Sequence, residues 1–384
     1  MQEKADDLNR RAWLTRVSDS NLAFILSKEA VEISTAIGYI KGRAEGLRTQ
    51  GFCFIRLSRH AEALPLLEEA EVLFTRLGDA CGQSDVSEYL GIIARSQGDY
   101  AASLNHLYRA LDLRQKEKYR DGESLSLYHL GVTYRYLGNL DKALEYFLQS
   151  LSLAREINHW IAESYSLNNI GSIYYELEDD ENALEYYNQS LSIRRSTGDK
   201  WGEAGCLDNI GNIHFKLQQY DEAMDFYQQA LSITIEVGDR KGQSNSLLHL
   251  ANIYLKKSDT GLALLNANGS LQIREETGDK KGQAEVYLCL AEITTANTAV
   301  ENAGETKIDF LQKALLIGEE TKALDLLCNI HNSLYTTYKN LHQYNEALKQ
   351  LEEFYALEKQ VHSNTLKQKV IALETTHQIG RAHV

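Results

Sequence analysis

The sequence has a single proline, only five cysteines and no apolar run long enough to cross a bilayer. One proline in 384 residues leaves little to interrupt helices, and the abundant alanine, leucine, glutamate and glutamine lose little conformational freedom in a helix. The cysteines are scattered without Cys-x-x-Cys pairs, which favours reduced, mostly buried thiols over a metal or redox site. These absences predict an all-α protein.

Positive charge is also scarce. The sequence has 40 Lys and Arg residues against 54 Asp and Glu residues, which gives a formal net charge of -14. Such a chain repels phosphate backbones and anionic lipids, so we expect no nucleic-acid partner and no membrane partner. The first seven residues are polar where a secretory signal would be apolar. We therefore expect a cytoplasmic protein.

Residues of the same character recur every forty positions. One column is almost entirely glycine: Gly42, Gly82, Gly122, Ala162, Gly202, Gly242 and Gly282. A second column is also small: Gly51, Gly91, Gly131, Gly171, Gly211, Ala251 and Ala291. A third column is aliphatic: Leu73, Leu113, Leu153, Ile193, Ile233 and Ile273. Several columns in one register predict a tandem repeat with a forty-residue unit.

Within each unit the apolar spacing predicts a helix, a turn and a second helix. Small residues on both helices would let the pair approach closely. The Gly-Asp pairs near residues 198, 238 and 278 predict a left-handed helix end followed by an aspartate that caps the next helix. One unit contains the motifs Leu130-Gly131-x-x-Tyr134, Leu137-Gly138, Ala143-Leu144-x-Tyr146-Phe147 and Ser150-Leu151.

These motifs resemble the tetratricopeptide repeat (TPR), a helix-turn-helix that stacks into a superhelix. The resemblance implies an all-α, TPR-type α-solenoid, a right-handed superhelix of antiparallel helix pairs with about eight repeats. The forty-residue length and the Gly-Asp link are similar to a longer subgroup found in cell-polarity adaptors and bacterial signalling proteins.

We expect the array to occupy residues 1–360. Its units are expected near 1–40, 41–80, 81–120, 121–160, 161–200, 201–240, 241–280, 281–320 and 321–360. After residue 291 the register slips by four residues, which predicts an insertion between about 295 and 306. Residues 361–378 are expected to form a C-terminal capping or linker helix, and residues 379–384 a non-native tail, because they break the helical composition.

Motifs that would indicate chemistry are missing from the sequence. It contains no His-Glu-x-x-His, Gly-x-Ser-x-Gly, Walker-type or Gly-x-Gly-x-x-Gly motif, and its eleven histidines are dispersed. We therefore expect no catalytic residues, no metal site and no cofactor.

A binding groove is expected instead. In the arrays that this chain resembles, the first helices line the concave face, so residues beside the packing column should face the groove. The candidates are Arg48, Phe52, Glu88, Arg95, Tyr128, Arg135, Tyr165, Asn168, Tyr175, Asp208, Asn212, Phe215 and Asn252. Tyr and Arg often anchor interfaces, and Asn can pair with peptide backbone, so the expected partner is a protein or peptide.

Two functions are consistent with this groove. The first is a non-catalytic scaffold that binds a protein or peptide. The second is the sensory N-terminal region of a truncated bacterial signalling enzyme, a diguanylate or adenylate cyclase or a histidine kinase. Residues 8–14 and 354–374 resemble the segments that flank the repeats in such enzymes, and a homodimer could form through the C-terminal helix.

Overall fold

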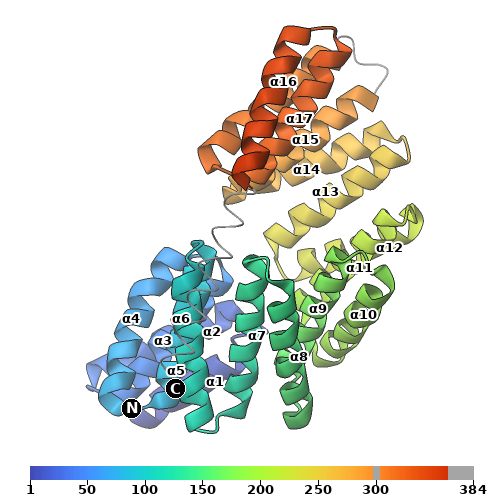
Figure 1. Ribbon diagram of the computed structural model, residues 1–384. Coiled ribbons are helices and arrows are strands. Elements are labelled where there is room, and N and C mark those ends of the chain that lie inside the picture. Colours follow the sequence, from blue (N-terminus) through green and yellow to red (C-terminus); the bar gives the residue numbers. More distant parts are fainter. Residues whose placement is uncertain (297–302, 362–384) are drawn as a thin grey trace. The chain divides into compact units, whose positions relative to one another are not determined.

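The computed structural model describes residues 1–296 and 303–361, and nearly all of them are helical. Seventeen helices have defined bounds within these residues, and a further helical segment runs from 344 to 361 (Figure 1). They are α1 (Gln2–Thr15), α2 (Ser20–Ala36), α3 (Ile40–Arg56), α4 (His60–Leu77), α5 (Ala80–Ser96), α6 (Tyr100–Lys116), α7 (Arg120–Tyr136), α8 (Leu140–Ile157), α9 (Trp160–Glu176), α10 (Asp180–Thr197), α11 (Lys200–Lys216), α12 (Tyr220–Glu236), α13 (Arg240–Lys256), α14 (Thr260–Thr277), α15 (Lys280–Ala296), α16 (Ala303–Thr321) and α17 (Leu324–Asn340). The predicted all-α solenoid is confirmed.

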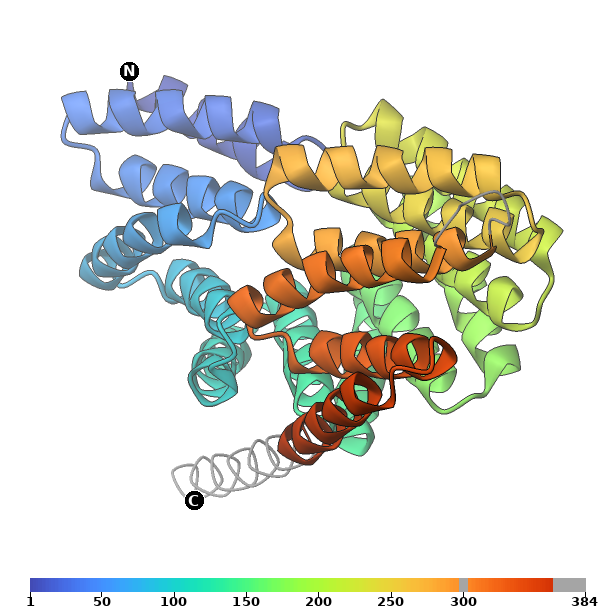
Figure 2. The same cartoon turned by 90° about the horizontal axis from the view of Figure 1, so that it is seen from above.

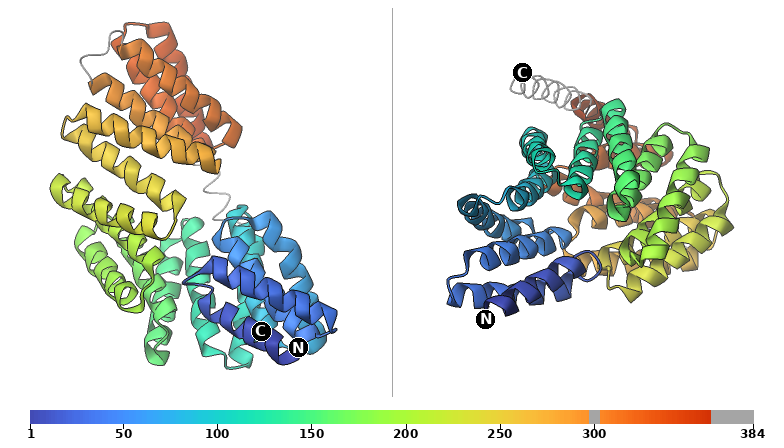
Figure 3. Two further views of the ribbon diagram at one scale, coloured as in Figure 1. Left: turned by 180° about the vertical axis from the view of Figure 1, so that it is seen from behind. Right: turned by 90° about the horizontal axis from the view of Figure 1, so that it is seen from below.

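The helices form two compact units, which are described separately. Unit 1 contains the hairpins α1–α2, α3–α4, α5–α6, α7–α8 and α9–α10, and unit 2 contains α11–α12, α13–α14 and α15–α16, followed by α17. Within each unit, consecutive hairpins lie side by side (Figures 2 and 3). Inside a unit, each first helix also contacts the first helix of the following hairpin, whereas the described second helices do not pack on one another to a comparable extent. The first helices therefore lie on the inner, concave side of each unit.

Glycine and aspartate set the helix ends as the sequence predicts. Gly198, Gly238 and Gly278 have φ values of 72°, 71° and 69°, in the left-handed region that glycine adopts without a steric penalty. The side chain of Asp239 then accepts a hydrogen bond of 2.9 Å from the amide of Gly242, which caps α13. These local signals fix where each helix begins and ends.

Small residues let the two helices of a hairpin approach closely. A Cβ atom on Gly131 of α7 would lie 2.6 Å from the ring of Phe147 on α8. The same relation holds one repeat later, where a Cβ on Gly171 would lie 2.9 Å from the ring of Tyr187. A larger residue at either position would push the aromatic ring out of its place, so the small column follows from the packing.

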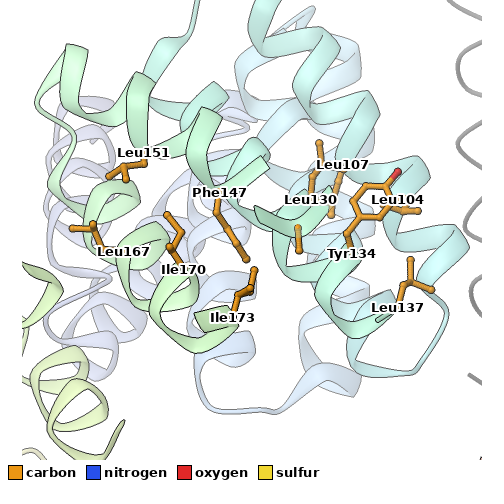
Figure 4. Packing of buried hydrophobic residues seen from close by; sticks show 11 residues of the cluster. Leu104, Leu107, Leu130, Tyr134, Leu137, Phe147, Leu151, Leu167, Ile170 and Ile173 are labelled. Carbon is orange, nitrogen blue, oxygen red and sulfur yellow. The ribbon is translucent and has the colours of Figure 1, made fainter. Parts of the chain in front are cut away.

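One core cluster of unit 1 extends from α6 to α9 and so crosses repeat boundaries. Phe147 is fully buried between Leu130 of its own hairpin and Ile170 of the next one (Figure 4). Burial of each such side chain contributes about 1.5 to 3 kcal/mol. Since each hairpin covers its neighbour, no repeat completes its core alone.

The register slip predicted in unit 2 is present. First helices begin at residues 200, 240 and 280, but the next one begins at Leu324, four residues late. Residues 297–302, inside the predicted insertion, lie outside the described residues. The predicted tail, and all but residue 361 of the predicted C-terminal helix over 361–378, also lie outside them.

Candidate functional site

The concave side of unit 1 contains a pocket of about 330 Å³. Helices α3, α5, α7 and α9 and the turn after α1 all contribute side chains to it. Its walls are mainly apolar and aromatic. The lining residues are Arg16, Val17, Phe52, Ile55, Arg56, Glu88, Tyr89, Ile92, Leu125, Tyr128, His129, Ile161 and Tyr165. Concave, mostly apolar pockets with a few polar groups are the usual form of a binding site.

Aromatic rings from successive repeats form much of the wall. The rings of Phe52 and Tyr89 have centroids 5.5 Å apart, and those of Tyr128 and Tyr165 are 5.4 Å apart. Tyr128 also packs 5.9 Å from Phe147, which belongs to the core. Because rings that pack on a core keep their orientation, this wall is held in place before any ligand arrives.

A buried ion network supports the pocket from behind. Arg114 of α6 is 1% exposed, and its guanidinium donates to Asp85 Oδ1 at 2.8 Å and to Glu88 Oε2. It also donates to the carbonyl of Gly122 at 2.9 Å and to Ser126 Oγ at 2.7 Å. Although burial alone would lower the pKa of Arg114, the charges of Glu88 and Asp85 raise it. The network joins α5, α6 and α7 and fixes the carboxylate of Glu88.

Two more arginines stack on the indole ring of Trp13, and one of them, Arg16, lines the pocket. The guanidinium carbon of Arg16 lies 3.6 Å from the ring centroid of Trp13, and that of Arg48 lies 3.8 Å from it. Arg48 is paired with Asp85 at 2.8 Å, whereas Arg16 forms no ion pair with any residue that the structure describes.

His129 contributes an uncharged ring to the wall. Burial and the nearby charges of Arg95 and Arg114 lower the pKa of His129 well below its ordinary value. Its Nε2 lies 4.0 Å from Glu88 Oε1. Burial likewise raises the pKa of Tyr89, which keeps the hydroxyl protonated. Neither side chain brings charge into the pocket near neutral pH.

The structure brings four of the predicted groove residues together. Phe52, Glu88, Tyr128 and Tyr165 all line the pocket, from four successive first helices. Glu88, however, is 3% exposed and is held by Arg114 rather than displayed to solvent.

The other predicted residues of unit 1 lie on the same helices but make contacts within the protein. Arg48 pairs with Asp85, and Arg95 donates to Thr133 Oγ1 at 3.3 Å. Arg135 donates from Nε to Glu176 Oε1 at 2.9 Å. Asn168 and Tyr175 are partly buried on α9.

The predicted residues of unit 2 also lie on first helices, all partly buried. Asp208 accepts a hydrogen bond from Ser246 Oγ at 3.2 Å, and burial raises the pKa of Asp208 to about 7. Asn212 Oδ1 accepts from the Tyr227 hydroxyl at 2.6 Å. The ring of Phe215 packs 5.6 Å from that of Tyr220, and Asn252 Oδ1 accepts from Cys289 Sγ at 3.4 Å.

Sequence reasoning missed several lining residues. Ile92, Leu125 and Ile161 lie four, three and four residues from predicted neighbours on their helices, so extending each prediction along its helix face would have found them. Arg16 carried no such signal. It lies three residues after Trp13 at the end of α1, and its guanidinium stacks on that ring.

Pairs that resemble catalytic groups have structural roles. Ser124 Oγ lies 2.9 Å from His159 Nδ1, but the hydroxyl is buried and donates to the carbonyl of Asp121 at 2.7 Å. Its proton is therefore committed to the backbone and not to a base. Burial raises the pKa of the Cys53 and Cys289 thiols to about 12, which makes them poor nucleophiles. No cluster of three metal-ligating side chains occurs among residues 1–296 and 303–361.

None of the helices that the structure describes is long and apolar enough to span a membrane.

A family model described as "Tetratricopeptide repeat" matches residues 42–116, 83–156, 122–196 and 203–276, together more than half of the chain. The chain belongs to the tetratricopeptide repeat family. The forty-residue subgroup suggested by the sequence is not distinguished by this match. A comparison with curated proteins finds no match to this TPR protein.

Solved structures share the fold at low sequence identity. A Rap protein complexed with Competence and Sporulation Factor has a TM-score of 0.68 at 14% identity, covering 96% of this chain and 100% of its own. The apo quorum sensor NprR from B. thuringiensis has a TM-score of 0.67 at 15% identity, with coverages of 93% and 99%. A signal transduction ATPase with a tetratricopeptide repeat sensor, from Pyrococcus horikoshii, has a TM-score of 0.66 at 18% identity and covers 97% of this chain and 55% of its own.

Proposed function

We propose that this TPR protein is a non-catalytic scaffold that binds a protein or peptide along the concave face of its first helices. The observation that carries the proposal is the pocket of unit 1, which opens on that face between aromatic side chains of successive repeats. Tyrosine and arginine are enriched among the side chains that dominate binding energy at interfaces. The concave face displays both.

The solved relatives support a peptide or protein partner. The Rap conjugation gene regulator of the plasmid pLS20 is in complex with the Phr* peptide, and its fold matches this chain with a TM-score of 0.59. The neighbours described above include no cyclase and no histidine kinase. They do not favour the alternative of a sensory region cut from such an enzyme. A homodimer through the C-terminal helix has no support from them either.

The experiment is selection of binding peptides from a displayed random library on the immobilised full chain. A variant in which Tyr128, Arg135, Asn168, Tyr175 and Asn212 are all changed to alanine should lose the selected peptides. A matched control carries Glu145→Ala, Gln149→Ala and Glu185→Ala on second helices, where the side chains are exposed or partly exposed. The control should bind as the wild type does.

Circular dichroism of both variants separates loss of binding from loss of fold. Retention of peptide binding by the helical fivefold variant would contradict the assignment of the concave face. Loss of binding by the control would contradict it equally.

A further inference from the structure

Arg16 is an arginine without a counter-ion at the edge of an apolar pocket. Its Nη1 donates to the carbonyl of Trp13, its Nε has no hydrogen-bond partner among the described residues, and no described carboxylate lies within ion-pair distance. Stacking on Trp13 at 3.6 Å holds the guanidinium at this edge. An anion that binds to such an arginine forms charge-assisted hydrogen bonds, which favours its binding.

The surroundings of Arg16 also carry surplus positive charge. Arg16, Arg48 and Arg114 supply three positive charges, and Asp85 and Glu88 supply two negative ones. Both carboxylates are already committed to Arg48 and Arg114. The pocket therefore favours an anion, although the whole chain has a net charge of -14.

Another cation strengthens this local field. Arg95 donates only to neutral acceptors, Thr133 Oγ1 and the carbonyl of His129. His129 stays neutral because burial lowers its pKa. Glu88 is the one acidic side chain among the lining residues, and Arg114 offsets its charge.

The other lining residues favour a ligand with an apolar, flat body. Phe52, Tyr89, Tyr128 and Tyr165 contribute aromatic rings, and Ile92 and Leu125 are among the aliphatic side chains. Aromatic ligands gain from offset or edge contacts with such rings beyond simple burial. A volume of about 330 Å³ is at the small end of ligand pockets, so it suits a small molecule rather than a folded element.

We infer that the pocket of unit 1 binds a small aromatic monocarboxylate, with the ring between the aromatic walls and the carboxylate on Arg16. The site lies on the same concave face as the proposed peptide contact, but binding of a small carboxylate there does not depend on peptide binding. All residues that line the site belong to unit 1. The protein would recognise the ligand by its single negative charge and its apolar body.

Three probes with one apolar body test the inference by isothermal titration calorimetry on the full chain: 3-phenylpropionate, the neutral 3-phenylpropanol and the cationic 3-phenylpropylamine. The carboxylate should bind at least tenfold more tightly than the alcohol, and the amine should bind more weakly than either. Equal binding of the three, or no binding of the carboxylate, would overturn the inference.

Two variants locate the site. Arg16→Gln keeps much of the side-chain stem but removes the charge, so it should weaken 3-phenylpropionate about ten- to a hundredfold and leave 3-phenylpropanol nearly unchanged. Ile92→Trp should fill the pocket and weaken both probes. Arg155→Gln, on the exposed side of α8, is the matched control and should change neither.

The variants also keep this inference distinct from the proposed function. If Arg16→Gln binds 3-phenylpropionate as the wild type does, the anion site is wrong, whatever the peptide selection shows. If the carboxylate binds as expected while no peptide is selected, the inference stands and the proposed function falls.

Discussion

Arg114 in unit 1 and Arg274 in unit 2 occupy the same column, 160 residues apart, and both are almost fully buried. Arg114 contacts two buried carboxylates, Asp85 and Glu88. Arg274 donates instead to the neutral Asn245 at 2.8 Å and to Glu285 at 2.9 Å, whose side chain is 42% exposed.

The difference arises from two equivalent positions on the first helices α5 and α13. Asn245 stands 160 residues after Asp85, and Leu248 stands 160 residues after Glu88. One repeat framework therefore holds a charged network in unit 1 and a mostly neutral one in unit 2. The charged version adjoins the pocket of unit 1, because Glu88 belongs to both.

The largest predicted effect is the difference in stability lost when each of these two arginines is replaced. Arg114→Met should lower the free energy of unfolding by about 3 to 5 kcal/mol, because it leaves buried Glu88 without its counter-ion. Arg274→Met should cost only about 1 to 2 kcal/mol, because Asn245 loses a hydrogen bond and Glu285 can turn to solvent. Urea unfolding followed by circular dichroism measures both.

A rescue variant sharpens the same prediction. Adding Glu88→Leu to Arg114→Met gives unit 1 the apolar residue that unit 2 has at this position, and Asp85 keeps its pair with Arg48. Much of the lost stability should return. Equal costs for the two single variants, or no rescue, would show that the network does not have the assigned role.

A smaller effect concerns pH and the column that contains Asn168 in unit 1 and Asp208 in unit 2. Burial raises the pKa of Asp208 from 3.8 to about 7, so the folded chain keeps a proton that the unfolded chain loses. The contribution of Asp208 to stability is complete below pH 3.8 and declines as the pH rises through 7. Asp208→Asn, which copies unit 1, removes this decline.

The advantage of Asp208→Asn over the wild type should grow by about 1 to 3 kcal/mol between pH 5 and pH 8. Parallel urea titrations at the two pH values measure it. A difference between variant and wild type that does not change with pH would mean that Asp208 titrates normally.

The sequence predicted what the repeat imposes on every unit. Gly171 had to be small because Tyr187 packs against it, and the same demand recurs every forty residues, so it leaves a visible column. The start of α17 at Leu324 was likewise predictable, because the four-residue slip shifts every later column equally.

The parts that could not be predicted depend on combinations of residues that occur in one repeat only. Asp85, Glu88 and Arg114 lie on two helices and meet only when the hairpin closes, and the column of Arg114 holds Phe74 and Ala154 in the adjacent repeats. Glu88 was therefore expected to face the groove, and its contact with Arg114 was not foreseen.

Photo-crosslinking on the full chain tests the central claim, that the concave face of the first helices is the binding face. p-Benzoylphenylalanine replaces Asn168 on the first helix α9 in one protein and Glu185 on the second helix α10 in another. The account predicts that a library-selected peptide crosslinks at position 168 and not at position 185. Crosslinking at 185 alone would contradict it.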